Sequence, residues 1–189
     1  MRIGIDISQL AYEHTGVASY LSSLVRELVK NEQHEYALFF ASLRKSLPVE
    51  FESAIQGNNV RIRKIKLSPT VLDLFWNRLH IAPIEWFIGD VDVFITSDWT
   101  EPPTKKAKKA TIIYDLVILK HPEETDQKIV SVQHPGETDQ KIVSVQKRKL
   151  NWVKKESNIV FCISKSSRND AIDILGLDPD KVKVIYPGV

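Results

Sequence analysis

Short apolar runs rich in β-branched residues alternate along the chain with longer segments that have an amphipathic helical pattern. Runs of this kind are typical of buried strands. Their alternation with helices favours a mostly parallel sheet with helices on both faces. Right-handed crossovers then predict a single Rossmann-like, doubly wound α/β domain over residues 1–189. The expected strands are residues 2–7, 35–40, 60–67, 91–96, 111–114, 158–163 and 182–185, and the expected helices begin at Gly16 and cover 69–80, 137–156 and 166–175.

The size and charge of the chain narrow the classes of function. With 189 residues it can form one sizeable domain, and its formal net charge of +2 is too small to indicate a nucleic-acid binder. The single cysteine, Cys162, is expected as a buried thiol in a strand, which fits a reducing compartment. No apolar run reaches the length of a membrane span, and the N-terminus does not have the pattern of a signal peptide. We therefore expect a cytoplasmic protein, or one peripheral at the inner face of the membrane.

A tandem duplication interrupts the regular pattern. Residues 121–133 read HPEETDQKIVSVQ and residues 134–146 read HPGETDQKIVSVQ, so the two copies differ only at Glu123 and Gly136. A shift of this length rotates a residue by about 220° around an α-helix. The two copies therefore cannot present the same face in one continuous helix. A natural duplication, a cloning accident and a deliberate insertion all explain the repeat.

The second copy is the better start for the long helix. A proline inside a helix costs about 3 kcal/mol, which favours a helix that begins near Pro135 and leaves the first copy outside it. In the alternative register, the acidic residues after Pro122 suit a helix N-terminus and the second copy bulges out. Because the copies are nearly identical, we hypothesise that the two states are close in energy. In the preferred register one stripe holds Ile142, Val145, Lys149, Leu150 and Val153.

A glycine turn lies between the first strand and the first helix, in the segment TGVASY at residues 15–20. At this position backbone amides and a helix N-terminus can approach a phosphate. The segment lacks the G-x-G-x-x-G pattern, which argues against an ordinary dinucleotide enzyme. The alternative interpretation of Gly16 is a simple loop glycine.

Motifs for hydrolysis, metal binding and nucleotide hydrolysis are missing from the sequence. It has no G-x-S-x-G elbow, no H-E-x-x-H, no Cys/His cluster and no P-loop. We therefore expect neither a bound metal nor a nucleophilic hydrolase.

Three stretches resemble the group 1 (family 4) retaining glycosyltransferases, in the same order. They are MRIGIDISQL…TGVASYLSSLVREL, then VDVFITSDWTEPP followed by KATIIYDLVILKHPE, and finally NIVFCISKSSRNDAIDILGLDPDKVKVIYPGV. The resemblance covers the chain apart from the duplicate, and its nearest branch is the mannosyltransferase-like one. It implies the N-terminal, acceptor-side domain of a GT-B enzyme, in which two Rossmann-like domains face each other across a cleft. The C-terminal, donor-binding domain is expected to be absent from this chain.

The resemblance also implies a reaction. The intact enzyme would transfer a sugar, with retention, from a nucleotide-sugar to a glycan or lipid-linked acceptor, and the donor phosphate would take the acceptor proton. The nucleotide-sugar is then a substrate and no cofactor is implied. The isolated half is expected to be inactive.

Site residues follow from the resemblance at matching positions. Gly16, with the amides of Val17 and Ala18 nearby, would lie against the donor diphosphate. The family's His-Asp pair corresponds to Tyr114 and Asp115. A phenol stays neutral near pH 7, unlike a histidine, so the tyrosine leaves no catalytic residue assigned in this half. A turn or capping role is the alternative for Asp115.

Three residues after the expected fourth strand are placed to line the acceptor side. These are Ser97, Asp98 and Trp99, of which the acid would hold sugar hydroxyls and the indole would stack on a sugar face. The alternative is a loop with one buried anchoring tryptophan. Ser164, after the Cys162 strand, is expected to cap the next helix.

A basic cluster follows the two prolines at 102–103. Lys105, Lys106, Lys108 and Lys109 are expected in a solvated loop, and the alternative is a patch for anionic lipid headgroups. Trp76, Trp86 and Phe87 would act as interfacial aromatic residues in the second case and as core residues in the first.

Two other hypotheses stay open beside the glycosyltransferase half. The first is a stand-alone Rossmann-like binding or interaction module, because a fold does not fix a function. The second is an engineered sequence in which a helix-start segment was duplicated to probe register or conformational switching.

Overall fold

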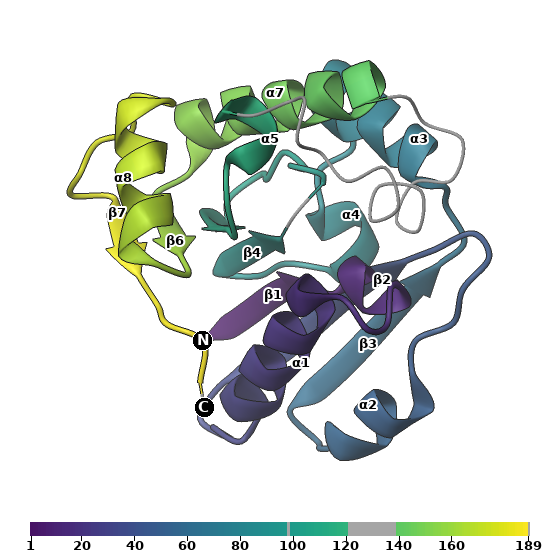
Figure 1. Cartoon of the computed structure of the whole chain (residues 1–189). Coiled ribbons are helices and arrows are strands. Elements are labelled where there is room, and N and C mark those ends of the chain that lie inside the picture. Colours follow the sequence, from purple (N-terminus) through teal and green to yellow (C-terminus); the bar gives the residue numbers. More distant parts are fainter. Residues whose placement is uncertain (98, 121–138, 189) are drawn as a thin grey trace.

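A seven-stranded sheet forms the centre of the domain in the computed structural model, which describes residues 1–97, 99–120 and 139–188 (Figure 1). Neighbouring strands are all parallel, in the order β3-β2-β1-β4-β5-β6-β7. The structure thus confirms the Rossmann-like, doubly wound α/β class. The strands are β1 (Arg2–Asp6), β2 (Glu35–Ala41), β3 (Val60–Ile65), β4 (Val93–Ser97), β5 (Lys108–Ile113), β6 (Ile159–Cys162) and β7 (Val182–Val184).

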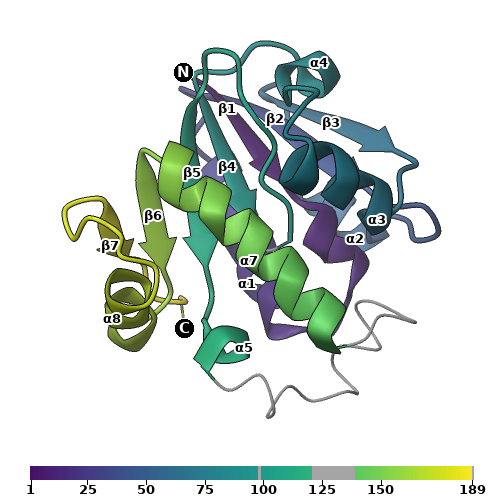
Figure 2. The same ribbon diagram turned by 90° about the horizontal axis from the view of Figure 1, so that it is seen from above.

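Helices cover both faces of this sheet (Figures 1 and 2). Figure 2 shows α7 crossing over the middle strands, with α1 behind the sheet. One face carries α1 (Gly16–Val29) and α2 (Val49–Ala54). The other carries α3 (Pro69–Leu72), α4 (Glu85–Ile88), α7 (Asp139–Glu156) and α8 (Lys165–Asp173), while the short α5 (Val117–Lys120) follows the end of β5.

The strand order places a topological switch beside β1. This strand pairs with β2 on one side and with β4 on the other, so the crossovers leave it in opposite directions. In open parallel sheets, ligands bind beyond the carboxyl ends of the strands at such a point. The segments after β1 and β4 are therefore the first places to look for a site.

Alternating burial along the strands divides the core into clusters on the two faces. Leu38 packs with the α1 side and its neighbour Phe39 with the α3 and α4 side, as expected for a strand buried on both faces. Trp76 belongs to this second cluster and Phe87 packs against it. Both are therefore core residues, as one of the two interpretations held.

The long helix α7 packs through the stripe that the second copy of the repeat predicts. The buried face of α7 contains residues 142, 145, 149, 150 and 153, and each of them is at most 7% exposed. The described helix begins at Asp139. The expected start near Pro135, and the whole first copy, lie outside the described residues, so the hypothesis of two registers stays a prediction.

Polar contacts attach α7 to the segment 69–80. This segment is helical as expected, but its second half is a π-helix, η2 (Asp73–Arg78). Arg148 on α7 donates through Nη2 to both carboxylate oxygens of Asp73, at 3.1 and 2.9 Å. The indole N–H of Trp152 donates to the carbonyl oxygen of Asn77 at 2.8 Å. Asp73, Trp76 and Asn77 of this π-helix are all buried.

Local capping at α8 follows the sequence. Ser164 has extended backbone angles, and its Oγ accepts a hydrogen bond from the amide of Ser167 at 3.0 Å, so it caps this helix as predicted. Within the described ranges, no helix is both long and apolar enough to cross a membrane.

Candidate functional site

A cleft of about 820 Å³ lies at the carboxyl edge of the sheet. Its walls come from the start of α1, from the segments after β5 and β6, and from the segment after β7. It therefore occupies the edge where parallel sheets bind ligands. The lining residues are His14, Thr15, Gly16, Val17, Ser19, Tyr20, Ser23, Leu24, Glu27, Tyr114, Asp115, Ile163, Ile185, Tyr186, Pro187 and Gly188.

The N-terminus of α1 lies in the wall of this cleft. Thr15 is the N-cap, and its hydroxyl accepts a hydrogen bond from the amide of Ala18 at 3.2 Å. The cap therefore already uses this amide, and the side chain of Ala18 is buried. The amides of Gly16 and Val17 donate to no described residue. These two donors, at the positive end of a helix, are available to an anion in the cleft.

Neither packing nor backbone conformation requires a glycine at position 16. A Cβ added there would meet no atom within 4 Å, and its φ is outside the left-handed region. The preceding turn instead places His14 at a φ of 69°, which is uncommon for a residue other than glycine. The space beside Gly16 is thus open to the cleft rather than filled by the protein.

Tyr114 and Asp115 form the part of the cleft wall that follows β5. The ring of Tyr114 lies edge-on to that of Tyr20, with centroids 5.6 Å apart, and its hydroxyl lies 3.3 Å from the Oγ of Ser97. Asp115 is exposed, and one of its carboxylate oxygens accepts a hydrogen bond from the amide of Val117 at 3.2 Å. Asp115 therefore stabilises the turn into α5 while also lining the cleft.

The residues expected on the acceptor side do not all share one hollow. Ser97 and Trp99 line a smaller cavity of about 50 Å³, at the carboxyl ends of β1 and β4. Asp98 lies outside the described residues. The contact between the hydroxyls of Ser97 and Tyr114 joins the wall of the small cavity to the wall of the cleft.

Polar residues of the small cavity were missed at the sequence level. Asp6 ends β1 and is only 4% exposed, and Gln9 lies in the 3-10 helix η1 (Ser8–Ala11) at 6% exposed. The pKa of Asp6 is raised from its ordinary 3.8 to about 6, chiefly by burial and to a smaller extent by the nearby carboxylate of Glu101. Hydrogen bonds from Ser8 and the charge of Lys149 act in the opposite direction. The available signal was an acid that directly ends a buried apolar strand.

The basic cluster is not a single solvated patch, because Lys109 is buried. It is 2% exposed, and its Nζ lies 3.0 Å from a carboxylate oxygen of Glu101 and 2.9 Å from one of Glu156. The expected loop was too long: β5 begins at Lys108, and the alternation of a strand turns Lys109 toward the face under α7. Lys108 on the opposite face stays exposed.

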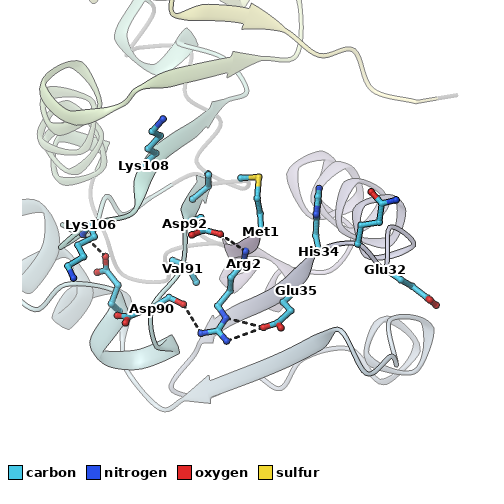
Figure 3. A pocket seen from close by; sticks show the side chains of 13 residues that line it. Met1, Arg2, Glu32, His34, Glu35, Asp90, Val91, Asp92, Lys106 and Lys108 are labelled. Carbon is cyan, nitrogen blue, oxygen red and sulfur yellow. Dashed lines mark hydrogen bonds and ion pairs between the residues drawn. The ribbon is translucent and has the colours of Figure 1, made fainter.

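The other lysines lie at the opposite edge of the sheet from the cleft. Lys106 and Lys108 line a hollow of about 1000 Å³ at the amino ends of the strands (Figure 3). There, Arg2 donates to Glu35 and to the carbonyl oxygen of Asp90, each at 3.1 Å. Because Arg2 is paired within the protein, this hollow is a weaker candidate site than the cleft.

Cys162 is a buried thiol and not an activated nucleophile. Burial raises the pKa of the Cys162 thiol to about 11, although the charge of Arg168 lowers it, so the thiol stays protonated at neutral pH. The described part of the chain contains no group of three or more His, Cys, Asp or Glu residues that could hold a metal ion.

Known structures share this fold. The crystal structures of Anabaena Alr3699/HepE in complex with UDP and glucose, and in complex with UDP-glucose, each have a TM-score of 0.52 and 12% identity. They match 100% of this chain, which spans 45% and 44% of theirs. The structure of Phytolacca americana apo UGT2 has a TM-score of 0.54 and 11% identity, over 100% of this chain and 52% of that one. At these identities the likeness shows the fold alone.

The sequence of the chain carries the family relationship. No curated protein matches it. The profile of "Glycosyltransferase Family 4", however, matches residues 14–189, which include the start of α1 and every wall of the cleft. The chain therefore belongs to Glycosyltransferase Family 4 and spans about half the length of the solved glycosyltransferase structures that share its fold.

Proposed function

We propose that this chain is the acceptor-side half of a retaining glycosyltransferase that uses a nucleotide-sugar donor. The observation that carries the proposal is the cleft at the carboxyl edge of the sheet, into which the N-terminus of α1 opens. A second domain, facing this cleft, would hold most of the donor. The acceptor is a glycan or a lipid-linked sugar, and the mannosyltransferase-like branch is part of the proposal.

The donor diphosphate would lie against the start of α1. The amides of Gly16 and Val17 donate to no described residue, and the helix dipole favours a negative group there. The amide of Ala18 is used by Thr15, so it contributes less than the resemblance suggested. The open space beside Gly16 allows a ligand to approach the backbone closely.

The proposed reaction needs no base from this domain. The acceptor hydroxyl oxygen bonds to the anomeric carbon of the donor sugar while the bond from that carbon to the donor phosphate breaks. The leaving phosphate takes the proton of the hydroxyl. Tyr114 and Asp115 would then bind or orient the acceptor, and Tyr114 is held in place by Ser97 and Tyr20.

Substituting Gly16 tests the diphosphate site without disturbing the helix. Gly16 is the first residue of α1, where proline is tolerated, and Thr15 already has the extended conformation that a following proline requires. Gly16→Pro therefore removes one amide donor and keeps the helix start. Gly16→Ala keeps the donor and adds only a Cβ, which meets no protein atom, so comparing the two variants separates the loss of the amide from the added carbon in the space open to the ligand.

The assay is a titration of the ¹⁵N-labelled chain with UDP-glucose, GDP-mannose and inorganic pyrophosphate. We expect amide shifts at Gly16 and Val17, and binding by Gly16→Pro that is weaker than binding by Gly16→Ala by about tenfold or more, since a hydrogen bond to a charged group contributes about 1.5–3 kcal/mol. Equal binding by both variants would exclude the diphosphate site. Sugar transfer by the 189-residue chain alone would exclude the proposal of a site shared with a second domain.

Peripheral membrane contact is a second candidate property, favoured by one exposed aromatic residue. Trp86 is 65% exposed, and the Nζ of Lys105 lies 5.4 Å from its ring centroid. Lys105, Lys106 and Lys108 would bind anionic lipid headgroups, and Trp86 would lie beside them at the membrane surface. The cleft lies at the opposite edge of the sheet from Lys106 and Lys108. We expect sedimentation with vesicles containing phosphatidylglycerol and not with pure phosphatidylcholine vesicles. Equal sedimentation after all three lysines are changed to glutamate would exclude this patch.

A further inference from the structure

A closed network of polar contacts joins η2, α7, β5 and the segment after β4. His80 follows η2, and its Nε2 lies 2.7 Å from Oε1 of Glu156 at the end of α7. The other carboxylate oxygen of Glu156 accepts a hydrogen bond from Nζ of Lys109 on β5 at 2.9 Å. Nζ of Lys109 also lies 3.0 Å from a carboxylate oxygen of Glu101, which follows β4. The amide of Glu101 donates to Oδ1 of Asn77 on η2 at 3.0 Å, and this contact closes the network.

Both ring nitrogens of His80 face oxygen atoms. Nδ1 lies 2.8 Å from the carbonyl oxygen of Trp76, which can only accept a hydrogen bond. Burial acts to raise the pKa of Glu156, but the hydrogen bonds and charges of Lys109 and His80 together lower it, so its carboxylate also accepts. A neutral imidazole has one N–H and therefore cannot donate to both oxygens. The contacts at both nitrogens are hydrogen bonds only when His80 and Glu156 share one proton more than a neutral imidazole and a carboxylate hold.

The charges of this network balance only with the additional proton. Glu101 and Glu156 contribute two negative charges, and Lys109 contributes one positive charge. Glu101 is 0% exposed and Lys109 is 2% exposed, so solvent screens an imbalance poorly. A positive charge on His80 brings the sum to zero. This charge is also favoured by the indole of Trp152, which is stacked on the imidazole with ring centroids 3.6 Å apart.

Other charged groups around the network come from α7, η2 and β1. Three of them form ion pairs where η2 meets α7, and these are Asp73, Arg78 and Arg148. On α7, Nζ of Lys155 lies 4.7 Å from the ring centroid of Trp152, and its charge disfavours a positive charge on His80. On β1, burial raises the pKa of Asp6 to about 6, although the charge of Lys149 acts to lower it. A pH titration of the domain therefore contains the contribution of Asp6 beside that of His80.

We propose that His80 and Glu156 form a pH-sensitive latch, which holds η2 against α7 and fixes the loop after β4 (residues 99–101) while the additional proton is bound. Histidine is the side chain that exchanges a proton in the physiological pH range. The latch is therefore closed at low pH and opens as the pH rises, because a ring nitrogen without a proton then faces a carboxylate. The closed latch also holds His80 at a φ of 52°, a strained conformation for a residue other than glycine. No ligand takes part, so the latch does not depend on the proposed function.

The latch acts on this loop through the side chain and the backbone of Glu101. Lys109, which Glu156 holds, binds its carboxylate, and Asn77 on η2 binds its amide. Nδ2 of Asn77 also donates to the carbonyl oxygen of Trp99 at 2.9 Å. Trp99 lines the small cavity at the carboxyl ends of β1 and β4. Opening of the latch should therefore loosen this loop and the wall of the small cavity.

Two substitutions separate the latch from the other titrating groups. His80→Phe keeps an aromatic ring beside Trp152 and cannot take up a proton. Glu156→Gln keeps the length of the side chain, and its amide can accept from Lys109 while it donates to a neutral imidazole. This second variant should stay closed as the pH rises, and it decides the test if His80→Phe does not fold. Glu50→Gln, at an exposed glutamate of α2, is the matched control for the loss of one negative charge.

The measurement is NMR of the ¹⁵N-labelled chain between about pH 5 and about pH 8, the range in which histidine titrates. Ring ¹⁵N shifts report the protons of His80, and hydrogen exchange reports the amides of η2 and of Glu101. As the ring loses its proton in the wild type and in Glu50→Gln, the protection factors of these amides should fall by about tenfold or more, the loss expected for one hydrogen bond to a charged group. Both latch variants should lack this fall.

Three results would overturn the proposal. In the first, His80 keeps both ring protons throughout this pH range. In the second, the ring loses a proton and the protection of η2 and Glu101 does not change. In the third, the fall persists in either latch variant, which would assign it to another group such as Asp6, or Glu50→Gln abolishes it as well.

Discussion

Asp6 should make the stability of this domain depend on pH. Its carboxyl is 4% exposed, and burial, as the largest cause, raises its pKa from 3.8 to about 6 in the folded chain. The folded state therefore holds this proton more tightly than the unfolded state. The resulting stabilisation is fully present below about pH 3.8 and is lost as the pH rises through about 6.

The size of the effect follows from the two pKa values. A difference of one pKa unit corresponds to about 1.4 kcal/mol, so the shift of Asp6 corresponds to about 3 kcal/mol of unfolding free energy across the window. Asp6→Asn removes the titration and keeps an oxygen that can accept from the amide of Ser8. Relative to the wild type, the variant should therefore gain about 3 kcal/mol between about pH 4 and about pH 8.

Urea unfolding of both proteins at several pH values measures this difference. Because only the difference between wild type and variant is used, the titration of other groups largely cancels. Asp180→Asn, at an exposed carboxylate, controls for the loss of one negative charge. A difference that does not vary with pH would refute the burial of an acid with a raised pKa. A difference of the opposite sign would mean that the charge of Lys149 outweighs the burial of Asp6.

Two further predictions concern the buried charges and the repeat. Lys109→Met leaves the carboxylates of Glu101 and Glu156 without their lysine, so urea unfolding should show a loss of about 3–5 kcal/mol of unfolding free energy. Lys108→Met, on the exposed face of the same strand, should change the unfolding free energy by no more than about 0.5 kcal/mol. Equal effects of the two substitutions would contradict the burial of Lys109. Deleting residues 121–133 or residues 134–146 leaves two sequences that differ at one position, which is a glycine in the first variant and a glutamate in the second. Both variants should therefore fold, and their melting temperatures, measured by circular dichroism, should lie within about 4 °C of each other. If only one variant folded, the two copies would not be interchangeable.

Much of the fold is predictable from local patterns. The expected strands and α1 all occur. Their apolar residues recur at the period of a strand or of a helix, and this pattern is visible in residues that are close together in the sequence. The capping role of Ser164 is equally local, since its hydroxyl and the amide it binds are three residues apart. The position of Gly16 at the carboxyl edge follows once a parallel sheet is predicted.

The details of the candidate site depend on contacts between distant parts of the chain. Lys109 looks like part of a solvated lysine cluster until Glu156, 47 residues away on α7, is placed beside it. The small cavity likewise combines the end of β1 with residues 97–100, which the strand order β1-β4 makes neighbours.

The sequence by itself therefore determined the fold class, the helix start at Gly16 and the family, because periodicity, caps and motifs are properties of consecutive residues. Only the tertiary structure decided which charges are buried, which amide of α1 is already used, and that Ser97 and Trp99 belong to a cavity with Asp6 and Gln9. The physical reason is that desolvation and pairing depend on what packs against a group, and for these residues the packing partners come from other elements of the sheet and from α7.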